Sequence, residues 1–182
     1  YFVFFFVCLL LYINFRVFFF LMIRRPPRST LDRSSAASDV YKRQKEKSVS
    51  STAGHQLMEN NPYASARYTQ ASQRLSQLLT VLRDGDLDTF GKITEDEALT
   101  LHALMMCSDP SYILMEEGSL SVINKIRKFR KDTGISIWFT LDAGPNVHVL
   151  YPEASESSVT PFILNELKPH CHEGKIIRDR VG

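Results

Sequence analysis

The chain has 182 residues, of which 44% are hydrophobic and 23% are charged, and its formal net charge is +2. This composition is ordinary for a globular protein and excludes collagen, a continuous coiled coil and general disorder. Residues 1–44 carry seven basic and two acidic side chains, so the other 138 residues have a net charge of −3. Because the positive charge is confined to this head, it does not indicate a nucleic-acid partner.

The first 23 residues are apolar and long enough to cross a membrane as a helix, with Arg24 and Arg25 on the cytoplasmic side. Asn14 and Arg16 oppose this interpretation, because an Arg near the centre of a membrane helix costs about 2.5 to 3.5 kcal/mol. A binding module anchored in the membrane by residues 1–23 therefore remains an alternative.

Residues 18–31 and 34–44 resemble the peptide obtained when sequencing-adapter DNA is translated. We therefore expect residues 1–44 to be a non-native head, either disordered or forming an isolated helix. Residues 45–182 are expected to form the native domain. Without the head, nothing in the sequence indicates a membrane.

The domain begins with a predicted strand and turn over residues 48–58. Asn60 or Asn61 is expected to cap a helix that has Pro62 in its first turn and ends at Gly85. Residues spaced by three and four predict its buried stripe: Tyr68, Ala71, Leu75, Leu78, Leu79 and Leu82.

Two further helices follow. One is expected to begin after Asp86 and to run to Cys107, before Asp109-Pro110, and the other covers residues 119–131, with Gly134 after it. Their predicted buried side chains are Leu87, Phe90, Ile93, Leu101, Leu104 and Met105 in the first helix, and Val122, Ile126 and Phe129 in the second.

Residues 135–141 and 147–151 are typical of two strands, and residues 142–146 of the turn between them. A helix over 157–167 and a strand over 175–181 complete the chain. This order predicts an α+β fold in which a small antiparallel sheet is covered on one face by helices. The sparse cysteines beyond the head, Cys107 and Cys171, indicate a reducing compartment.

Three segments could carry chemistry. Residues 49–55 combine hydroxyls and small residues that could hold an oxyanion, although a Ser-rich turn has the same composition. Asp142 is placed at a strand end as an acid–base group would be, although a turn-capping Asp would also suit it. Residues 170–172 lack the spacing of a metal site, so no metal is expected there. His102, beside an apolar stripe, is typical of a hydrogen-bonded core histidine.

Taken together, residues 49–52, 97–103 and 139–147 resemble the C-terminal half of the diphosphomevalonate decarboxylase family, which belongs to the GHMP kinase superfamily. The resemblance spans about residues 45–182 and implies a ferredoxin-like C-terminal domain. It also implies a cytoplasmic, homodimeric enzyme of isoprenoid synthesis that uses ATP and Mg²⁺. That family phosphorylates the C3 hydroxyl of (R)-5-diphosphomevalonate, and loss of phosphate and CO₂ then gives isopentenyl diphosphate.

The resemblance also implies the roles of individual residues. Asp142 would be the catalytic carboxylate that orients or deprotonates the C3 hydroxyl. Ser51 and Thr52 would bind the diphosphate or carboxylate end of the substrate, and Ala143 and Gly144 would let the backbone approach it. His102 matches the family pattern without an implied role.

The family's nucleotide loop and the Arg that holds the substrate carboxylate lie in an N-terminal domain that we expect this chain to lack. No cofactor-binding residue or metal ligand is therefore assigned here, and the chain alone is expected to be inactive. A mevalonate 3-kinase or a phosphomevalonate decarboxylase of the same superfamily remains an alternative. Asp142 in its Asp-Ala-Gly-Pro-Asn setting favours the enzyme that both phosphorylates and decarboxylates.

Overall fold

The computed structural model describes residues 15–20, 61–141 and 144–178. The helices and strands, in chain order, are β1 Phe15–Phe20, α4 Ala64–Asp84, α5 Leu87–Met106, α6 Glu117–Thr133, β2 Trp138–Leu141, β3 Val147–Pro152, α7 Glu156–Phe162 and β4 Ile177–Arg178. A π-helical turn over Ile163–Leu167 continues α7, so the predicted helix over 157–167 is present in two parts.

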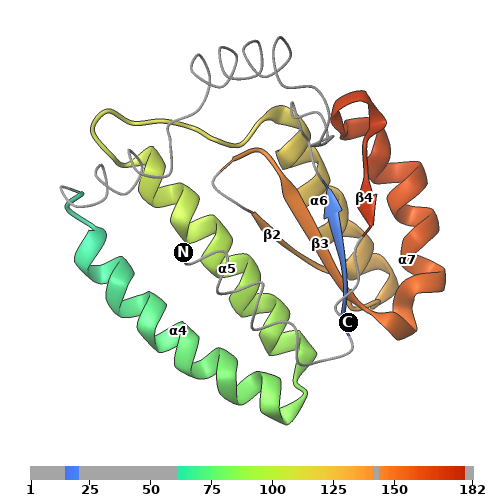
Figure 1. Cartoon of the computed structure of the whole chain (residues 1–182), viewed down its shortest axis with the longest axis horizontal. Coiled ribbons are helices and arrows are strands. Elements are labelled where there is room, and N and C mark those ends of the chain that lie inside the picture. The colour runs from blue at the N-terminus through green and yellow to red at the C-terminus, as the bar shows by residue number, and fades with distance from the viewer. Residues whose placement is uncertain (1–14, 21–60, 142–143, 179–182) are drawn as a thin grey trace, which may run out of the picture.

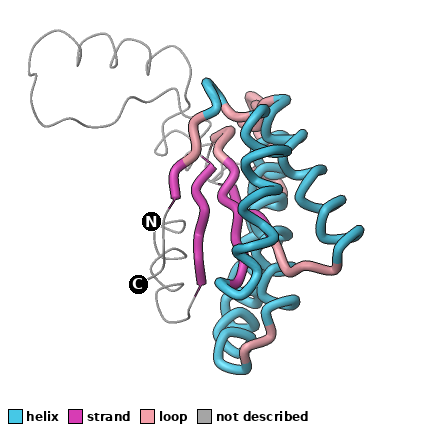
Figure 2. Tube along the Cα trace, turned by 90° about the vertical axis from the view of Figure 1, so that its right-hand side faces the viewer, coloured by secondary structure: helices cyan, strands magenta, loops and turns pink. Residues whose placement is uncertain are grey.

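The four strands form one antiparallel sheet in the order β2-β3-β1-β4. In Figure 2 the strands form a layer with the helices to its right, and Figure 1 shows α5 beside the edge strand β2. The hairpin of β2 and β3 pairs Leu141 with Val147 and Trp138 with Leu150. The predicted α+β class with a small antiparallel sheet is therefore confirmed.

Strand β1 lies between β3 and β4, and it pairs Phe20 with Val147 and Phe18 with Arg178. The strand expected within residues 48–58 lies outside the described residues. The head was expected to be disordered or to form an isolated helix, and the structure differs from this over Phe15–Phe20. Aromatic residues favour extended backbone, and a position inside the sheet gives the backbone groups of this segment partners on both sides.

Helix α4 follows a turn held by Asn61, whose Oδ1 accepts a hydrogen bond from the backbone N–H of Tyr63 at 2.9 Å. The side-chain Nδ2 of Asn61 donates to the carbonyl of Leu104 at 3.0 Å, which ties the start of α4 to the end of α5. Gly85 ends the helix with a φ of 72°, as predicted.

The stripe predicted for α4 is partly wrong. Leu78 and Ala71 are buried, but Tyr68 is 53% exposed and Leu79 is 45% exposed. Helix α4 is the outermost helix in Figure 1 and packs mainly on α5. Its buried residues, Ala64, Ala71 and Leu78, lie seven apart on one line along the helix, and this narrow line is enough for the contact with α5.

Helix α5 begins as predicted, because the Oδ1 atom of Asp86 accepts a hydrogen bond from the backbone N–H of Thr89 at 3.0 Å. Helix α6 begins two residues earlier than predicted. Its N-cap is Glu116, whose backbone N–H donates to Ser119 Oγ at 3.2 Å. Gly134, with a φ of 69°, ends α6 where it was expected to end.

Two apolar clusters hold the helices to the hairpin. The larger cluster joins α6 and α7 to side chains of the strands such as Phe139 and Val149. The smaller one joins Trp138 and Leu150 to α4 and α5. Neighbouring strand residues point to opposite sides of a sheet. Helices α6 and α7 thus cover one face of the sheet, as predicted. Near the edge strand β2, helices α4 and α5 also pack against the opposite face.

Candidate functional site

The candidate site lies at the turn end of the hairpin. Leu141 and Val147 pair across the two strands and are both buried, so residues 142–146 connect the strands at this end. Of the five residues predicted for the site, the structure places Gly144, which is half-buried in this turn. The other four lie outside the described residues: Asp142, Ala143, Ser51 and Thr52.

The turn is fastened to the N-terminus of α6. Ser119 Oγ donates a hydrogen bond to the carbonyl of Pro145 at 2.7 Å and accepts one from the backbone N–H of Glu116 at 3.2 Å. Ser119 is fully buried, which shields both bonds from water. The sequence analysis missed Ser119, although a Ser three residues after an acidic N-cap is a pattern that could have indicated a cap.

His102 lies on α5 and is only 2% exposed. Its Nδ1 is 2.9 Å from the carbonyl oxygen of Ala98, one helical turn earlier. The expectation of a hydrogen-bonded core histidine is therefore confirmed at Nδ1. The second ring nitrogen, Nε2, is buried and has no partner among the described residues.

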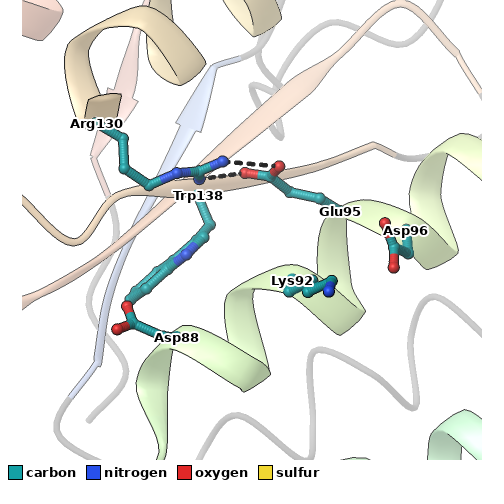
Figure 3. A pocket seen from close by; sticks show the side chains of 6 residues that line it. All are labelled: Asp88, Lys92, Glu95, Asp96, Arg130 and Trp138. Carbon is teal, nitrogen blue, oxygen red and sulfur yellow. Dashed lines mark hydrogen bonds and ion pairs between the residues drawn. The ribbon is translucent and has the colours of Figure 1, made fainter. Parts of the chain in front are cut away.

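A separate hollow of about 310 Å³ lies between α5 and α6. Figure 3 shows the six side chains that line it, which are those of Asp88, Lys92, Glu95, Asp96, Arg130 and Trp138. Glu95 and Arg130 form a two-pronged ion pair with nitrogen–oxygen distances of 2.6 and 3.2 Å. Arg130 Nη1 also donates to the carbonyl of Ile137 at 2.6 Å. The pair thus connects α5, α6 and the residue before β2.

The Glu95–Arg130 pair is structural. The side chain of Glu95 is 6% exposed, and a carboxylate at that depth needs a close cationic partner. Nothing in the sequence pattern indicates this pair, and no substrate or cofactor is assigned to the hollow.

The segment around Cys171 offers little reactivity. Burial raises the pKa of the Cys171 thiol to about 11, because the charged thiolate is disfavoured away from water.

Within residues 15–20, 61–141 and 144–178, no three His, Cys, Asp or Glu side chains come together as a metal-binding group. No helix in this described part has both the length and the apolar character needed to cross a bilayer.

The comparisons with known proteins return mevalonate diphosphate decarboxylases and, at 25% identity over 84 residues, the phosphomevalonate decarboxylase of Haloferax volcanii, of which the match covers 26%, with 46% of this chain. The profile described as the mevalonate 5-diphosphate decarboxylase C-terminal domain matches residues 40–180. The diphosphomevalonate decarboxylase of Schizosaccharomyces pombe is 28% identical over 116 residues, which make up 62% of this chain and 30% of that protein. The chain thus spans under a third of that relative's length.

Solved structures share the fold. The mevalonate pyrophosphate decarboxylase from Streptococcus pyogenes has a TM-score of 0.70 at 20% identity, covering 93% of this chain and 45% of that one. The mevalonate diphosphate decarboxylase from Enterococcus faecalis, reported for its mevalonate diphosphate-mediated ATP binding mechanism, has a TM-score of 0.61 at 22% identity, covering 91% and 42%.

Proposed function

The chain belongs to the family of mevalonate 5-diphosphate decarboxylase C-terminal domains, and we propose that it forms the C-terminal half of an ATP-dependent decarboxylase acting on (R)-5-diphosphomevalonate. The observation that carries this proposal is the family match over residues 40–180, which includes the turn that joins β2 to β3. A cytoplasmic location and a homodimer of the whole enzyme are parts of the same proposal.

Asp142 is the proposed catalytic carboxylate. It orients or deprotonates the C3 hydroxyl, whose oxygen attacks the γ-phosphate of ATP, and ADP leaves. Phosphoryl transfer passes through a loose transition state, so positioning contributes more than basicity. The C3 phosphate then departs with its bonding electrons and leaves cationic character at C3. The electrons of the bond between C1 and C2 form the new double bond, and CO₂ and isopentenyl diphosphate result.

The surroundings of the turn support this role. Ser119 holds the carbonyl of Pro145, and the β2–β3 pairing holds Leu141, so described contacts fix both sides of residues 142–144. A carboxylate that works by positioning needs such a rigid support. Ser51 and Thr52 are proposed to bind the diphosphate or carboxylate end of the substrate, with Ala143 and Gly144 allowing a close backbone approach.

ATP is a substrate of the proposed reaction, and Mg²⁺ would accompany it. The described residues contain no group of three side chains that could hold a cation. We therefore assign no Mg²⁺ ligand within them and derive no step through the metal. Nucleotide binding is proposed to use residues outside this chain.

The test joins residues 45–182 to the N-terminal half of a relative and supplies ATP with mevalonate, its 5-phosphate or its 5-diphosphate. We expect phosphate, CO₂ and isopentenyl diphosphate from the 5-diphosphate alone. Turnover of the 5-phosphate in its place, or phosphorylation without release of CO₂, would contradict the proposed substrate or reaction. The unjoined chain serves as the control, and it is expected to release no product.

A further inference from the structure

Described hydrogen bonds tie the start of α4 and the loop after α5 to the end of α5. The side-chain Nδ2 of Asn61, which precedes α4, donates to the carbonyl of Leu104 at 3.0 Å. The backbone N–H of Tyr112, in the loop between α5 and α6, donates to the carbonyl of Met105 at 3.4 Å. Three separate parts of the chain therefore meet where α5 ends.

The loop continues to the start of α6, and this start is fastened to the hairpin. Ser119 Oγ donates to the carbonyl of Pro145 at 2.7 Å. In Figure 1 the loop, drawn in yellow, runs from the end of α5 to the start of α6 across the upper part of the molecule. We call this region the turn end, and it consists of residues 61–66, 104–120 and 144–147.

Large apolar side chains gather on the surface of the turn end. Tyr63, Met106, Ile113 and Leu120 are exposed by 60, 42, 71 and 50%, respectively. The other large apolar side chains with such exposure among the described residues are spread over α4, the π-helical turn and β4. A gathering of exposed apolar side chains is typical of a surface that binds another protein surface.

The charges of the turn end define which surface it can bind. Its residues include three acids and neither Lys nor Arg, and all three acids are exposed: Asp109, Glu116 and Glu117. Two copies of this surface would repel each other, and so would an anionic lipid or a nucleic acid. The matching partner therefore has an apolar surface with Lys or Arg at its edge.

The length of the solved relatives indicates where such a partner comes from. This chain covers 45% of the Streptococcus pyogenes enzyme and 42% of the Enterococcus faecalis enzyme. We propose that the turn end is the surface on which the N-terminal half of the enzyme docks, through the four exposed apolar side chains and through Lys or Arg side chains opposite the three acids. The inference rests on the proposed function, in which that half brings ATP to the hairpin turn.

The test measures how fast iodoacetamide alkylates single cysteines, followed peptide by peptide with mass spectrometry. Cys107 is exposed and directly follows Met106, so it reports on the turn end. Ile113→Cys supplies a second probe there, and Leu79→Cys, at a 45% exposed position on α4, is the control. We expect both turn-end thiols to react at least about tenfold more slowly in the joined enzyme than in the full chain, and the control thiol to react equally in both.

Three results would overturn the docking surface. The turn-end thiols could react equally in both proteins, or they could react slowly in the full chain already. Protection in the full chain that grows with its concentration would show that a second copy is the occupant. Product assays on the same samples separate this inference from the proposed function. Product from a joined enzyme with reactive turn-end thiols refutes the surface alone, and protected thiols without product refute the function alone.

A charge reversal tests the chemistry of the partner surface. Glu117→Lys places a positive charge on the turn end, and Asp84→Lys places one at the last residue of α4, about 30 Å along that helix from its start. We expect Glu117→Lys to speed alkylation of Cys107 in the joined enzyme about threefold or more at low ionic strength, and less at high ionic strength. Equal rates in the two variants would overturn the assignment of Lys or Arg to the partner.

Discussion

At the scale of single residues, the sequence predicts what depends on neighbours along the chain. Asp86 caps α5 through Thr89, three residues away, and Gly85 ends α4 in a conformation that a glycine adopts without strain. Ser119 was missed because its partner, the carbonyl of Pro145, lies 26 residues away. Asp142 was open to two interpretations from the residues alone, and only the resemblance favoured the catalytic one.

Ser119→Ala tests the support of the turn. It removes the donor to the carbonyl of the half-buried Pro145, and losing such a hydrogen bond typically costs about 0.5 to 1.5 kcal/mol. We expect a loss of that size in the free energy of unfolding, measured with urea. Ser158→Ala, at an exposed position on α7, is the control and should change stability by less than about 0.5 kcal/mol. Equal stability of the two variants would contradict the role of Ser119.

At the scale of helices and strands, periodicity and turn residues located the three long helices and the hairpin of the described residues, with ends that differ by a few residues. The buried side of α4 could not be predicted well, because the width of an apolar stripe depends on how many neighbours a helix has. Gly91 illustrates the same limit. Within a helix it weakens the pattern, yet the structure shows that Trp138 occupies the space that a side chain there would need.

The ion pairs of α5 give a test at this scale. Glu95→Gln leaves Arg130 without its carboxylate beneath the sheet edge, and breaking a buried pair costs about 3 to 5 kcal/mol, less here because Arg130 is 29% exposed. We expect a clear loss of unfolding free energy. Asp96→Asn is the matched control, because its pair with Arg74 is longer, at 3.3 Å, and its carboxylate is 40% exposed where that of Glu95 is 6% exposed, so the loss should stay below about 1 kcal/mol. A larger loss in the control than in Glu95→Gln would contradict the structural role of the Glu95–Arg130 pair.

At the scale of the whole molecule, the structure adds a strand that the sequence analysis did not expect. Strand β1 comes from the head and lies inside the sheet, between β3 and β4. The family match begins at residue 40, so most of the head lies outside it. Whether residues 1–44 are native stays a prediction. The chain spans under a third of the Schizosaccharomyces pombe relative, so the account of catalysis concerns an enzyme longer than this chain.

The kcat of Asp142→Asn in the joined enzyme tests the proposed role of the Asp142 carboxylate. An amide can neither accept the C3 proton nor orient the hydroxyl as a carboxylate does, so kcat should fall about 10² to 10⁴-fold. Asp132→Asn, which removes an exposed carboxylate paired with Lys128 on α6, should leave kcat unchanged. An Asp142→Asn enzyme that releases CO₂ and isopentenyl diphosphate at the wild-type rate would contradict the account.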